Sequence, residues 1–187
     1  MLDHFSLLAP LYDRLIGPPN HEKLRDFLRL PSSGWMLDAG GGTGRVSSTL
    51  RPLVDHLVVS DLSRPMLLQA QRKGNLCSIQ AHVERLPFPA DTFERVLVVD
   101  ALHHFCDQRE SLGDLLRVLK PGGRLLIEEP NIHRVVVKGV AVAEKLALMR
   151  SRFLSPEMIR DIIASYGYSA AIRDHDRFRA WIFVDKE

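Results

Sequence analysis

Three alternating glycines follow a short apolar run and carry the first chemical signal of the chain. The run ends at Asp38 and Ala39, and Gly40, Gly42 and Gly44 follow, ahead of a segment of helical length. Without a Cβ atom at these positions the backbone can turn tightly or approach a ligand closely. The spacing predicts a loop that holds a nucleotide-type cofactor, with a tight turn that binds nothing as the alternative.

Two neighbours of these glycines indicate the charge of the expected ligand. The dinucleotide fingerprint GxGxxG requires a glycine where this chain has Arg45, so the loop disfavours a pyrophosphate. The carboxylate of Asp38 would repel a diphosphate and attract an ammonium or a sulfonium group. The loop therefore favours a cationic cofactor.

A second acidic residue, Asp61, ends the next apolar run. At the carboxyl end of a neighbouring strand its carboxylate would accept hydrogen bonds from both hydroxyls of a ribose. The alternative role is a helix N-cap, although Ser63 could fill that position with Pro65 in the first turn. The loop 81–88 would lie at the same edge of the sheet and could clamp a base.

Two adjacent histidines, His103 and His104, follow another apolar run and are candidates for a general base. An imidazole with a pKa of about 6.5 can take a proton from a phenol or an enol at neutral pH. Both histidines could instead brace the turn that leads to Asp107. Glu128 and Glu129 alternate faces of an expected strand, so one should reach the substrate side. Glu129 is the weaker second candidate, with a salt bridge as its alternative role.

The elements that position these side chains alternate between strands and helices. Five short apolar runs bounded by Gly, Pro or charge predict strands: Trp35–Ala39, Leu57–Asp61, Leu76–Ala81, Phe93–Asp100 and Arg124–Glu129. Three segments between them predict helices: Thr43–Leu53, Arg64–Arg72 and Gln108–Leu119. Continuous apolar strands separated by helices predict a parallel sheet covered on both faces, which is a doubly wound α/β fold.

The pattern changes after the fifth expected strand. Val135–Met149 is a long and mostly apolar helical segment, and Glu157–Tyr166 predicts a second helix. Ser169–Arg173 and Phe178–Val184 predict an antiparallel hairpin that ends the sheet. The apolar residues of the long segment could line an apolar substrate cavity, pack in the core or contact a second copy of the chain.

Length and composition exclude several classes of protein. A chain of 187 residues, 45% of them hydrophobic and 26% charged, suits a single globular domain over 1–187. Twenty-five Lys and Arg against 23 Asp and Glu, without long runs of like charge, argue against a nucleic-acid partner. The chain has neither a membrane-length apolar stretch nor a signal peptide, so we expect a cytoplasmic protein without a transmembrane segment. Cys77 and Cys106 have no metal-site spacing, and no metal site is predicted.

Four motifs in order resemble the class I S-adenosylmethionine-dependent methyltransferases, particularly the type 11 enzymes related to those of ubiquinone and menaquinone biosynthesis. The acidic residue and GxGxG of 38–44 resemble the family's cofactor loop, and Asp61 within VVSDLSRPML resembles its ribose-binding acid. LPFPADTFERVLVVDALHHF is similar to the segment that leads into the family's fourth strand, and RVLKPGGRLLIEEP is similar to its fifth-strand block. The opening segment 5–13 resembles the helix that folds over the cofactor.

The resemblance implies a Rossmann-like α/β fold, with a doubly wound, seven-stranded, mostly parallel sheet, an antiparallel C-terminal hairpin and a small helical lid. It implies one domain in which 1–30 form an N-terminal helical lid and 131–167 form a helical insert over the substrate. S-adenosyl-L-methionine would be the cofactor and S-adenosyl-L-homocysteine the product. The residues expected to bind the cofactor are Tyr12, Asp38, Ala39, Gly40, Gly42, Gly44, Asp61, Leu62, His82, Val83 and Asp100.

The resemblance also assigns separate roles within that set. The methionine amino group would meet the Asp38 side chain and nearby carbonyls, Asp61 would hold the ribose, and Leu62 would pack on the adenine. Relatives commonly have Asp where this chain has His82, which could accept from the adenine amino group only in one neutral tautomer. Asp100 would offer its backbone carbonyl to the methionine amino group.

The expected activity is methyl transfer to a small-molecule acceptor, apolar or quinone-like, with a homodimer as an open option. His104 matches a histidine of a frequent family pattern, whereas His103 falls where some quinone O-methyltransferases have a metal-binding Glu. The alternatives are a non-catalytic protein that binds the same cofactor and an NAD-dependent oxidoreductase, which Arg45 and Asp38 disfavour.

Overall fold

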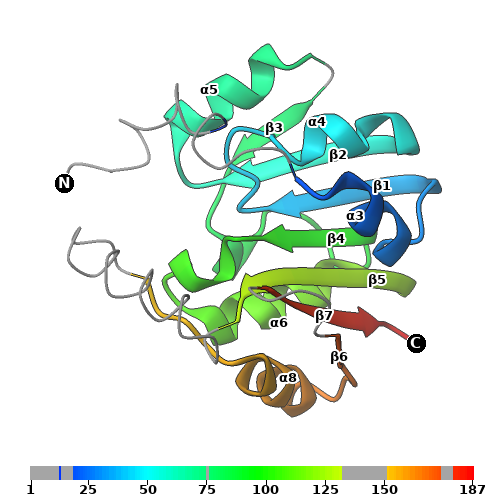
Figure 1. Ribbon diagram of the computed structural model, residues 1–187, viewed down its shortest axis with the longest axis vertical. Coiled ribbons are helices and arrows are strands. Elements are labelled where there is room, and N and C mark those ends of the chain that lie inside the picture. The colour runs from blue at the N-terminus through cyan, green and yellow to red at the C-terminus, as the bar shows by residue number, and fades with distance from the viewer. Residues whose placement is uncertain (1–12, 14–18, 75, 132–150, 174–178) are drawn as a thin grey trace.

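A seven-stranded sheet organises the residues that the computed structural model describes, which are 13, 19–74, 76–131, 151–173 and 179–187. The strand order is β3-β2-β1-β4-β5-β7-β6 (Figure 1). The strands are β1 (Ser32–Ala39), β2 (Val54–Asp61), β3 (Cys77–Gln80), β4 (Phe93–Val99), β5 (Leu119–Pro130), β6 (Ala171–Arg173) and β7 (Arg179–Asp185).

The direction of the strands confirms the doubly wound topology. β1 pairs in parallel with β2 and β4, β2 with β3, and β4 with β5. β7 runs antiparallel between β5 and β6, which is the expected C-terminal hairpin. The chain moves outward from β1 to β3 and then returns to β4, so the loops after β1 and β4 diverge. Open α/β sheets bind ligands in the crevice at such a switch point.

Helices cover both faces of this sheet (Figure 1). One layer holds α3 (His21–Phe27), α4 (Ser47–Leu50) and α5 (Arg64–Arg72), and the other holds α6 (Gln108–Val118) and α8 (Pro156–Ser165). Three short 3₁₀ turns complete the described elements: η1 (Arg51–Leu53), η2 (Val83–Arg85) and η3 (Leu102–His104).

Two hydrophobic clusters lie on opposite faces because successive strand residues point in opposite directions. Met36 shares one cluster with Leu24 of α3 and Leu67 of α5. Leu37 belongs to the other, with Leu112 of α6. Burial on both faces is the reason that the strands read as continuous apolar runs.

Several element boundaries differ from the sequence prediction. The expected helix Thr43–Leu53 is limited to α4 and η1, since turns continue from the glycines through 46. β5 begins at Leu119, which pairs with Phe93 across an irregularity in the ladder. The predicted helix Val135–Met149 lies outside the described residues.

The described part of the expected N-terminal lid includes α3, which packs into the core. Leu24 and Leu28 are fully buried in the cluster that also contains Trp181 and Phe183. The ring of Phe27 meets both of these aromatic rings edge-on, with centroids 5.0 Å apart in each pair. This segment therefore forms part of the layer on the sheet.

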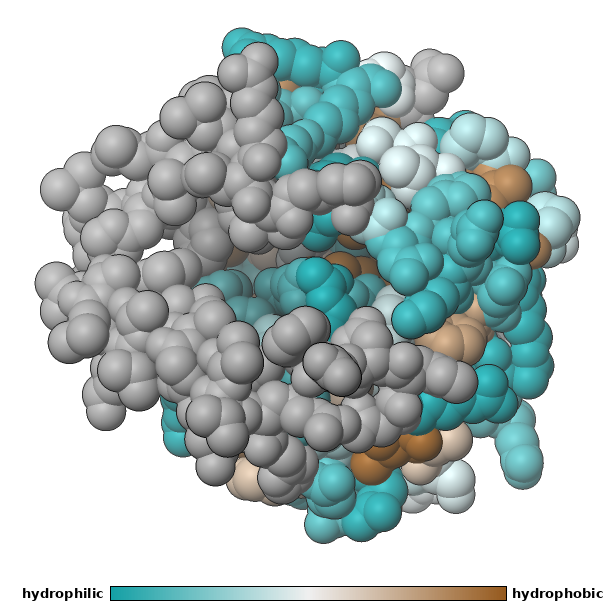
Figure 2. Space-filling model, viewed as in Figure 1, coloured by the Kyte–Doolittle hydropathy of each residue, from teal (hydrophilic) through white to brown (hydrophobic). Residues whose placement is uncertain are grey.

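In the described ranges, no helix is both long and apolar enough to cross a membrane. Among the described residues on the face shown in Figure 2, hydrophilic side chains predominate and hydrophobic ones form small, separate patches. Scattered apolar residues of this kind are normal on a protein surface.

Phe93 tests the packing of the layer formed by α6. Its side chain is fully buried, and its ring meets Phe88 edge-on with centroids 4.9 Å apart. Phe93→Ala should lower the free energy of unfolding by about 3–5 kcal/mol, because it leaves a cavity. Urea denaturation would measure the loss, with Leu68→Ala on the exposed side of α5 expected to change it by about 0.5 kcal/mol or less. A loss below about 1 kcal/mol at Phe93 would contradict this packing.

Candidate active site

The glycine loop, residues 40–44, joins β1 to the turn before α4 and is tied to the neighbouring strand. The N–H groups of Gly40 and Gly41 both donate to the carbonyl of Ser60 in β2, at 2.8 and 3.2 Å. The N–H of Gly44 donates to the carbonyl of Gly41 at 2.9 Å. These bonds fix the loop at the carboxyl edge of the sheet, where β1, β2, β4 and β5 end.

At Gly42, crowding by neighbouring atoms does not explain why the residue is a glycine. A Cβ at Gly41 would come within 2.7 Å of Asp38, and one at Gly44 within 2.7 Å of Leu76. A Cβ at Gly42 would come no nearer than 3.8 Å to its closest neighbour, Asp61 Oδ2. Its φ of +54° is a left-handed conformation that favours glycine, and its open side lies next to Asp61. A ligand could therefore approach the backbone there, as the expected cofactor requires.

Asp61 connects the glycine loop with the start of α5. Its Oδ2 accepts from the N–H of Gly42 at 2.9 Å, and its Oδ1 accepts from the N–H of Ser63 at 2.7 Å. Ser63 occupies the N-cap position, but its side chain makes no capping bond. The expectation that the Ser63 side chain caps the helix was wrong. The Asp61 carboxylate instead accepts from the N–H of the N-cap residue itself. Asp61 itself is partly exposed, and ribose binding stays a prediction.

Asp38 lies beneath the glycine loop, where it is 1% exposed. Its Oδ2 accepts a hydrogen bond from Ser47 Oγ at 2.5 Å. Burial raises the pKa of Asp38 to about 6, with the Ser47 hydrogen bond opposing the change and repulsion from Asp61 adding to it. In this arrangement the negative charge of Asp38 would attract a cation on the other side of the glycine loop. The expected direct contact between Asp38 and an amino group stays a prediction.

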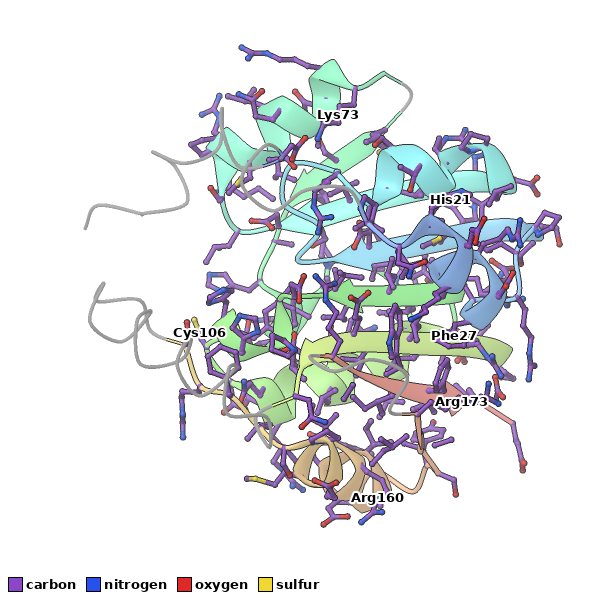
Figure 3. All side chains as sticks on the ribbon, in the orientation of Figure 1. His21, Phe27, Lys73, Cys106, Arg160 and Arg173 are labelled. Atoms are coloured by element: carbon purple, nitrogen blue, oxygen red, sulfur yellow. The ribbon has the colours of Figure 1, made fainter. Side chains whose placement is uncertain are left out.

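Asp13 contacts the glycine loop, and the sequence did not predict it as a site residue. Its Oδ1 accepts from Thr43 Oγ1 at 2.5 Å, and its Oδ2 pairs with Lys73. Lys73, which Figure 3 labels at the end of α5, also donates to the Thr43 carbonyl at 2.7 Å. Sequence patterns are local, so they could not reveal a contact between residues that lie so far apart. Asp13 belongs to the segment expected to fold over the cofactor, and Tyr12 beside it lies outside the described residues.

The side of the loop expected to hold the adenine offers both apolar and polar groups. Leu62 is 49% exposed, an unusual degree for a large apolar residue. Val83 is buried in the core cluster, whereas His82 is exposed, with its Nδ1 3.6 Å from Glu84 Oε2. Leu62 and His82 are thus accessible to a ligand, and Val83 supports the turn from below.

Asp100 and Glu128 meet one guanidinium at the ends of β4 and β5. Arg179 pairs with Glu128 Oε1, and its Nη1 lies 3.4 Å from Asp100 Oδ2. Burial raises the pKa of Asp100, and burial also raises the pKa of Glu128 to about 7, with Arg179 opposing the change in both cases. Arg179 was missed because it opens the last strand. That strand runs antiparallel, so its first residue reaches the carboxyl edge of the others.

His103 is held by Glu129, the neighbour of Glu128 on β5. Nδ1 of His103 lies 2.6 Å from Glu129 Oε2, and the two side chains are 4% and 5% exposed. The other carboxylate oxygen accepts from the N–H groups of Ala101 and Leu102, at 2.9 and 2.8 Å. The His103 ring also stacks on Phe153, with centroids 4.4 Å apart. Glu129 thus makes the buried pair that the sequence suggested as its alternative role.

His104 lies in a different environment from its neighbour. Its Nδ1 is 3.2 Å from Ser151 Oγ. Burial, and to a smaller extent repulsion from His103, lowers the pKa of His104 to about 3. The ordinary imidazole pKa assumed from the sequence therefore does not hold for His104, because desolvation disfavours its charged form. A catalytic role for either histidine stays a prediction.

Two further observations bound the described site. In the parts of the chain that the structure describes, no group of three or more His, Cys, Asp or Glu side chains is arranged to hold a metal ion. A shallow depression of about 300 Å³ between α6 and α8 includes none of the strand ends described above; it is lined by Arg109, Met158, Asp161 and Ile162.

The glycine loop and the sheet order define a protein class that the comparison with a family model also identifies. Residues 37–127, which run from β1 into β5, match the family described as a methyltransferase domain. This part of the chain thus resembles methyltransferase domains, the class that the motifs predicted.

The relatives by sequence are C-methyltransferases. The chain is 38% identical over 104 residues to the ubiquinone/menaquinone biosynthesis C-methyltransferase UbiE of Vibrio parahaemolyticus. It is 36% identical over 104 residues to that of Proteus mirabilis. The matches cover 50% of this chain and 40% and 41% of those proteins, so the chain matches less than half the length of these relatives.

Solved structures share the fold at lower identity. A putative methyltransferase of Haloferax volcanii, in complex with the Trm112 methyltransferase activator, has a TM-score of 0.81 and 17% identity, over 99% of this chain and 98% of that one. Phosphoethanolamine N-methyltransferase 2 of Haemonchus contortus, in complex with phosphomonomethylethanolamine and S-adenosylhomocysteine, has a TM-score of 0.79 and 16% identity, over 99% of this chain and 60% of that one. These similarities confirm the Rossmann-like methyltransferase fold.

The raised pKa of Asp38 predicts how stability depends on pH. The folded chain holds a proton on Asp38 up to about pH 6, whereas the ordinary pKa is 3.8. A group whose pKa is raised by folding contributes stability below its unfolded pKa and loses it as the pH rises through the folded value. Between pH 4 and 6 the free energy of unfolding should therefore fall more steeply in the wild type than in Asp38→Asn.

Urea denaturation at a series of pH values would measure this difference, and Asp26→Asn serves as the control because Asp26 is exposed. Equal slopes in the wild type and Asp38→Asn would show that Asp38 has an ordinary pKa.

Proposed function

We propose that this chain binds S-adenosyl-L-methionine and transfers its methyl group to a small-molecule acceptor. The observation that carries the proposal is the open backbone at Gly42, with the buried carboxylate of Asp38 beneath the loop and the carboxylate of Asp61 beside it. This arrangement attracts a cation and offers ribose hydroxyls an acceptor, but it repels a diphosphate. The sequence similarity to C-methyltransferases supports the same activity.

Different residues would hold the separate parts of the cofactor. An ionised carboxylate has about four acceptor positions, so Asp61 can keep its bonds to Gly42 and Ser63 and still accept from a ribose. The exposed side chain of Leu62 offers an apolar surface to the adenine. Asp38 and the carbonyl of Asp100 would attract the ammonium group.

The bound cofactor supplies an electrophilic methyl group on a positively charged sulfur. Transfer of this group disperses the charge, so the protein mainly needs to orient the acceptor and exclude water. The carboxyl ends of β4 and β5 carry the polar side chains that are suited to that task. They are Asp100, His103, Glu128 and Glu129, the last three of which are almost fully buried.

The proposal extends to the acceptor, which we expect to be an apolar or quinone-like small molecule. The named relatives act in ubiquinone and menaquinone biosynthesis, and they match the chain over half of its length. The apolar segment Val135–Met149, expected to line a substrate cavity, lies outside the described residues. The acceptor is therefore proposed from the relatives and from the composition of that segment.

Gly42→Ala tests cofactor binding without removing a polar group. The added Cβ would occupy the open side of the loop, so the dissociation constant for S-adenosyl-L-homocysteine should rise at least about tenfold, equivalent to about 1.4 kcal/mol. Isothermal titration calorimetry would measure it. Gly122→Ala is the matched control, because Gly122 also has a left-handed φ of +76° and open surroundings but lies near the start of β5, at the edge of the sheet opposite the glycine loop.

Gly122→Ala should therefore leave the affinity unchanged. A wild-type chain that gave no heat with S-adenosyl-L-methionine or S-adenosyl-L-homocysteine, but saturated with NAD, would overturn the proposal in favour of an oxidoreductase.

The acceptor can be identified with a methyl-deuterated cofactor and a fractionated extract of the source organism. We expect mass spectrometry to show one small apolar molecule that gains a deuterated methyl group. Asp61→Ala should abolish that product, because its lost hydrogen bonds to a charged group are each worth about 1.5–3 kcal/mol. Label found only in nucleic acid would contradict a small-molecule acceptor. Cofactor binding without a product in any fraction would favour the non-catalytic alternative.

A further inference from the structure

We infer that Asp13 helps to select the charge of the ligand on the glycine loop, because it neutralises Lys73 beside that loop. The inference rests on the proposed function and adds a residue that favours a sulfonium cofactor over an anionic adenine nucleotide. Its starting observation is that a carboxylate and an ammonium group from distant parts of the chain both bond to Thr43 and to each other.

Three segments that lie far apart in the sequence meet at Thr43. Asp13 Oδ1 accepts from Thr43 Oγ1 at 2.5 Å, and Asp13 Oδ2 pairs with the ammonium group of Lys73. Lys73 is the C-cap residue of α5, and its ammonium group donates to the Thr43 carbonyl at 2.7 Å. Thr43 is 2% exposed, so both groups contact a buried part of the loop. The positive charge of Lys73 is therefore bonded directly to the backbone of the loop.

The end of α5, which carries Lys73, packs closely against the glycine loop. A Cβ at Gly44 would come within 2.7 Å of Leu76 Cδ1 and 3.1 Å of Ala70 Cβ. The N–H of Lys73 donates to the Ala70 carbonyl at 3.0 Å. Ala70 and Leu76 both belong to the hydrophobic cluster on this face of the sheet. This packing holds the backbone of Lys73 beside the loop.

The charge of Lys73 lies within range of a ligand on the open side of the loop. Gly42, where the backbone is open, is the neighbour of Thr43 in the chain. Consecutive Cα atoms are about 3.8 Å apart. Charges interact over a Debye length of about 8 Å at physiological ionic strength. An uncompensated charge on Lys73 would therefore act on a charged ligand at Gly42.

A lysine beside a glycine-rich loop is the arrangement that phosphate-binding loops use. In those loops the backbone N–H groups surround the phosphates, and the lysine supplies the positive charge. Here the Asp13 carboxylate pairs with Lys73, so the two side chains together carry no net charge. The carboxylates of Asp38 and Asp61 then make the potential at the loop negative. Asp13 thus opposes the binding of a diphosphate.

A second cation, Arg45, follows the loop directly and is compensated by other groups. Burial raises the pKa of three carboxyl groups at this edge of the sheet, and the charge of Arg45 opposes the change in each. They are Asp38, Asp100 and Glu128. The carboxylate that pairs with Lys73 is Asp13. Loss of the Asp13 charge would therefore uncover the charge of Lys73 and leave that of Arg45 balanced.

Three ligands that share adenosine but differ in charge test the inference on the full chain. S-adenosyl-L-methionine carries a sulfonium, S-adenosyl-L-homocysteine has a neutral thioether in its place, and ADP carries a diphosphate. Asp13→Asn keeps an oxygen that can accept from Thr43 Oγ1, but it removes the charge beside Lys73. Isothermal titration calorimetry in a buffer of low ionic strength would measure the three dissociation constants.

The three ligands should respond differently to Asp13→Asn. S-adenosyl-L-methionine should bind about 2- to 30-fold more weakly, which is the effect of a unit charge about 8 Å away for effective dielectric constants between about 80 and 20. S-adenosyl-L-homocysteine should change by about twofold or less, because its sulfur is neutral. ADP should bind more tightly than it does to the wild type. Added salt should reduce these differences, because it screens the charges.

Lys73→Met and the double variant separate an effect of charge from a loss of packing. Lys73→Met leaves the Asp13 charge uncompensated, so the ratio of affinities should shift in favour of S-adenosyl-L-methionine over ADP. The variant with both substitutions carries no charge at either position and should restore the wild-type ratio. A loss of stability would weaken all three ligands together and could not reverse the sign. If Asp13→Asn does not fold, the direction of the shift in Lys73→Met decides the question by itself.

Asp161→Asn is the matched control. It removes the carboxylate whose Oδ1 lies 3.1 Å from Nη2 of Arg160 on α8, and both side chains of that pair are exposed. Figure 3 places Arg160 at the opposite end of the view from Lys73. This substitution makes the same change in net charge as Asp13→Asn, but we expect it to leave all three affinities unchanged. An equal response in the two variants would show that net charge, and not the position of Asp13, determines the selectivity.

The pattern across ligands and variants separates the inference from the proposed function. Equal losses for all three ligands in Asp13→Asn, or no change in any of them, would show that Asp13 only braces the loop, and the inference would be wrong. A double variant that kept the altered ratio would also overturn it, because the effect would not depend on Lys73. In these cases binding of S-adenosyl-L-methionine to the wild type leaves the proposed function standing. A wild type that binds neither sulfur ligand would contradict the proposed function, and the inference with it.

Discussion

A negative charge held beneath an open stretch of backbone is the feature on which the candidate site depends. Burial of Asp38 raises its pKa to about 6, because removal of a carboxylate from water is costly and the Ser47 hydrogen bond compensates only in part. A cation above the loop would offset that cost, whereas a diphosphate would add to it. The same carboxylate explains Gly41, where a Cβ would come within 2.7 Å of it. One group therefore shapes the loop and selects the charge of its ligand.

The pleat of β5 divides the polar groups of the carboxyl edge into two sets. Glu128 and Glu129 point to opposite faces because side chains alternate along a strand. Glu128 pairs with Arg179, and Glu129 pairs with His103. The sheet therefore separates a charged cluster beside the layer of α3 from a buried histidine beside the layer of α6. Two adjacent glutamates thus lie in two different chemical environments. Rotation of a side chain could not move either glutamate into the environment of the other, because the sheet lies between them.

Much of the architecture could be predicted because its signals are local. Continuous apolar runs between helical segments indicated a parallel sheet, and all seven strands and the terminal hairpin are present in the structure. The glycine loop and Asp61 lie side by side, as their positions after consecutive strands implied. Boundaries were less accurate where hydrogen bonds extend beyond the apolar pattern, as at Leu119. The missing side-chain cap at Ser63 was also not predicted, because a side chain near a helix start can bond to several different backbone groups.

The sequence by itself determined the order of elements, the open glycine loop and the sign of the charge beside it. Only the tertiary structure decided that Asp13 and Lys73 meet at Thr43, that Arg179 reaches the carboxyl edge, and which histidine is held by a carboxylate. The physical reason is that hydrophobic periodicity and backbone freedom act between neighbours in the chain. Ion pairing and pKa depend instead on burial and distance, which exist only once strands far apart in sequence have paired.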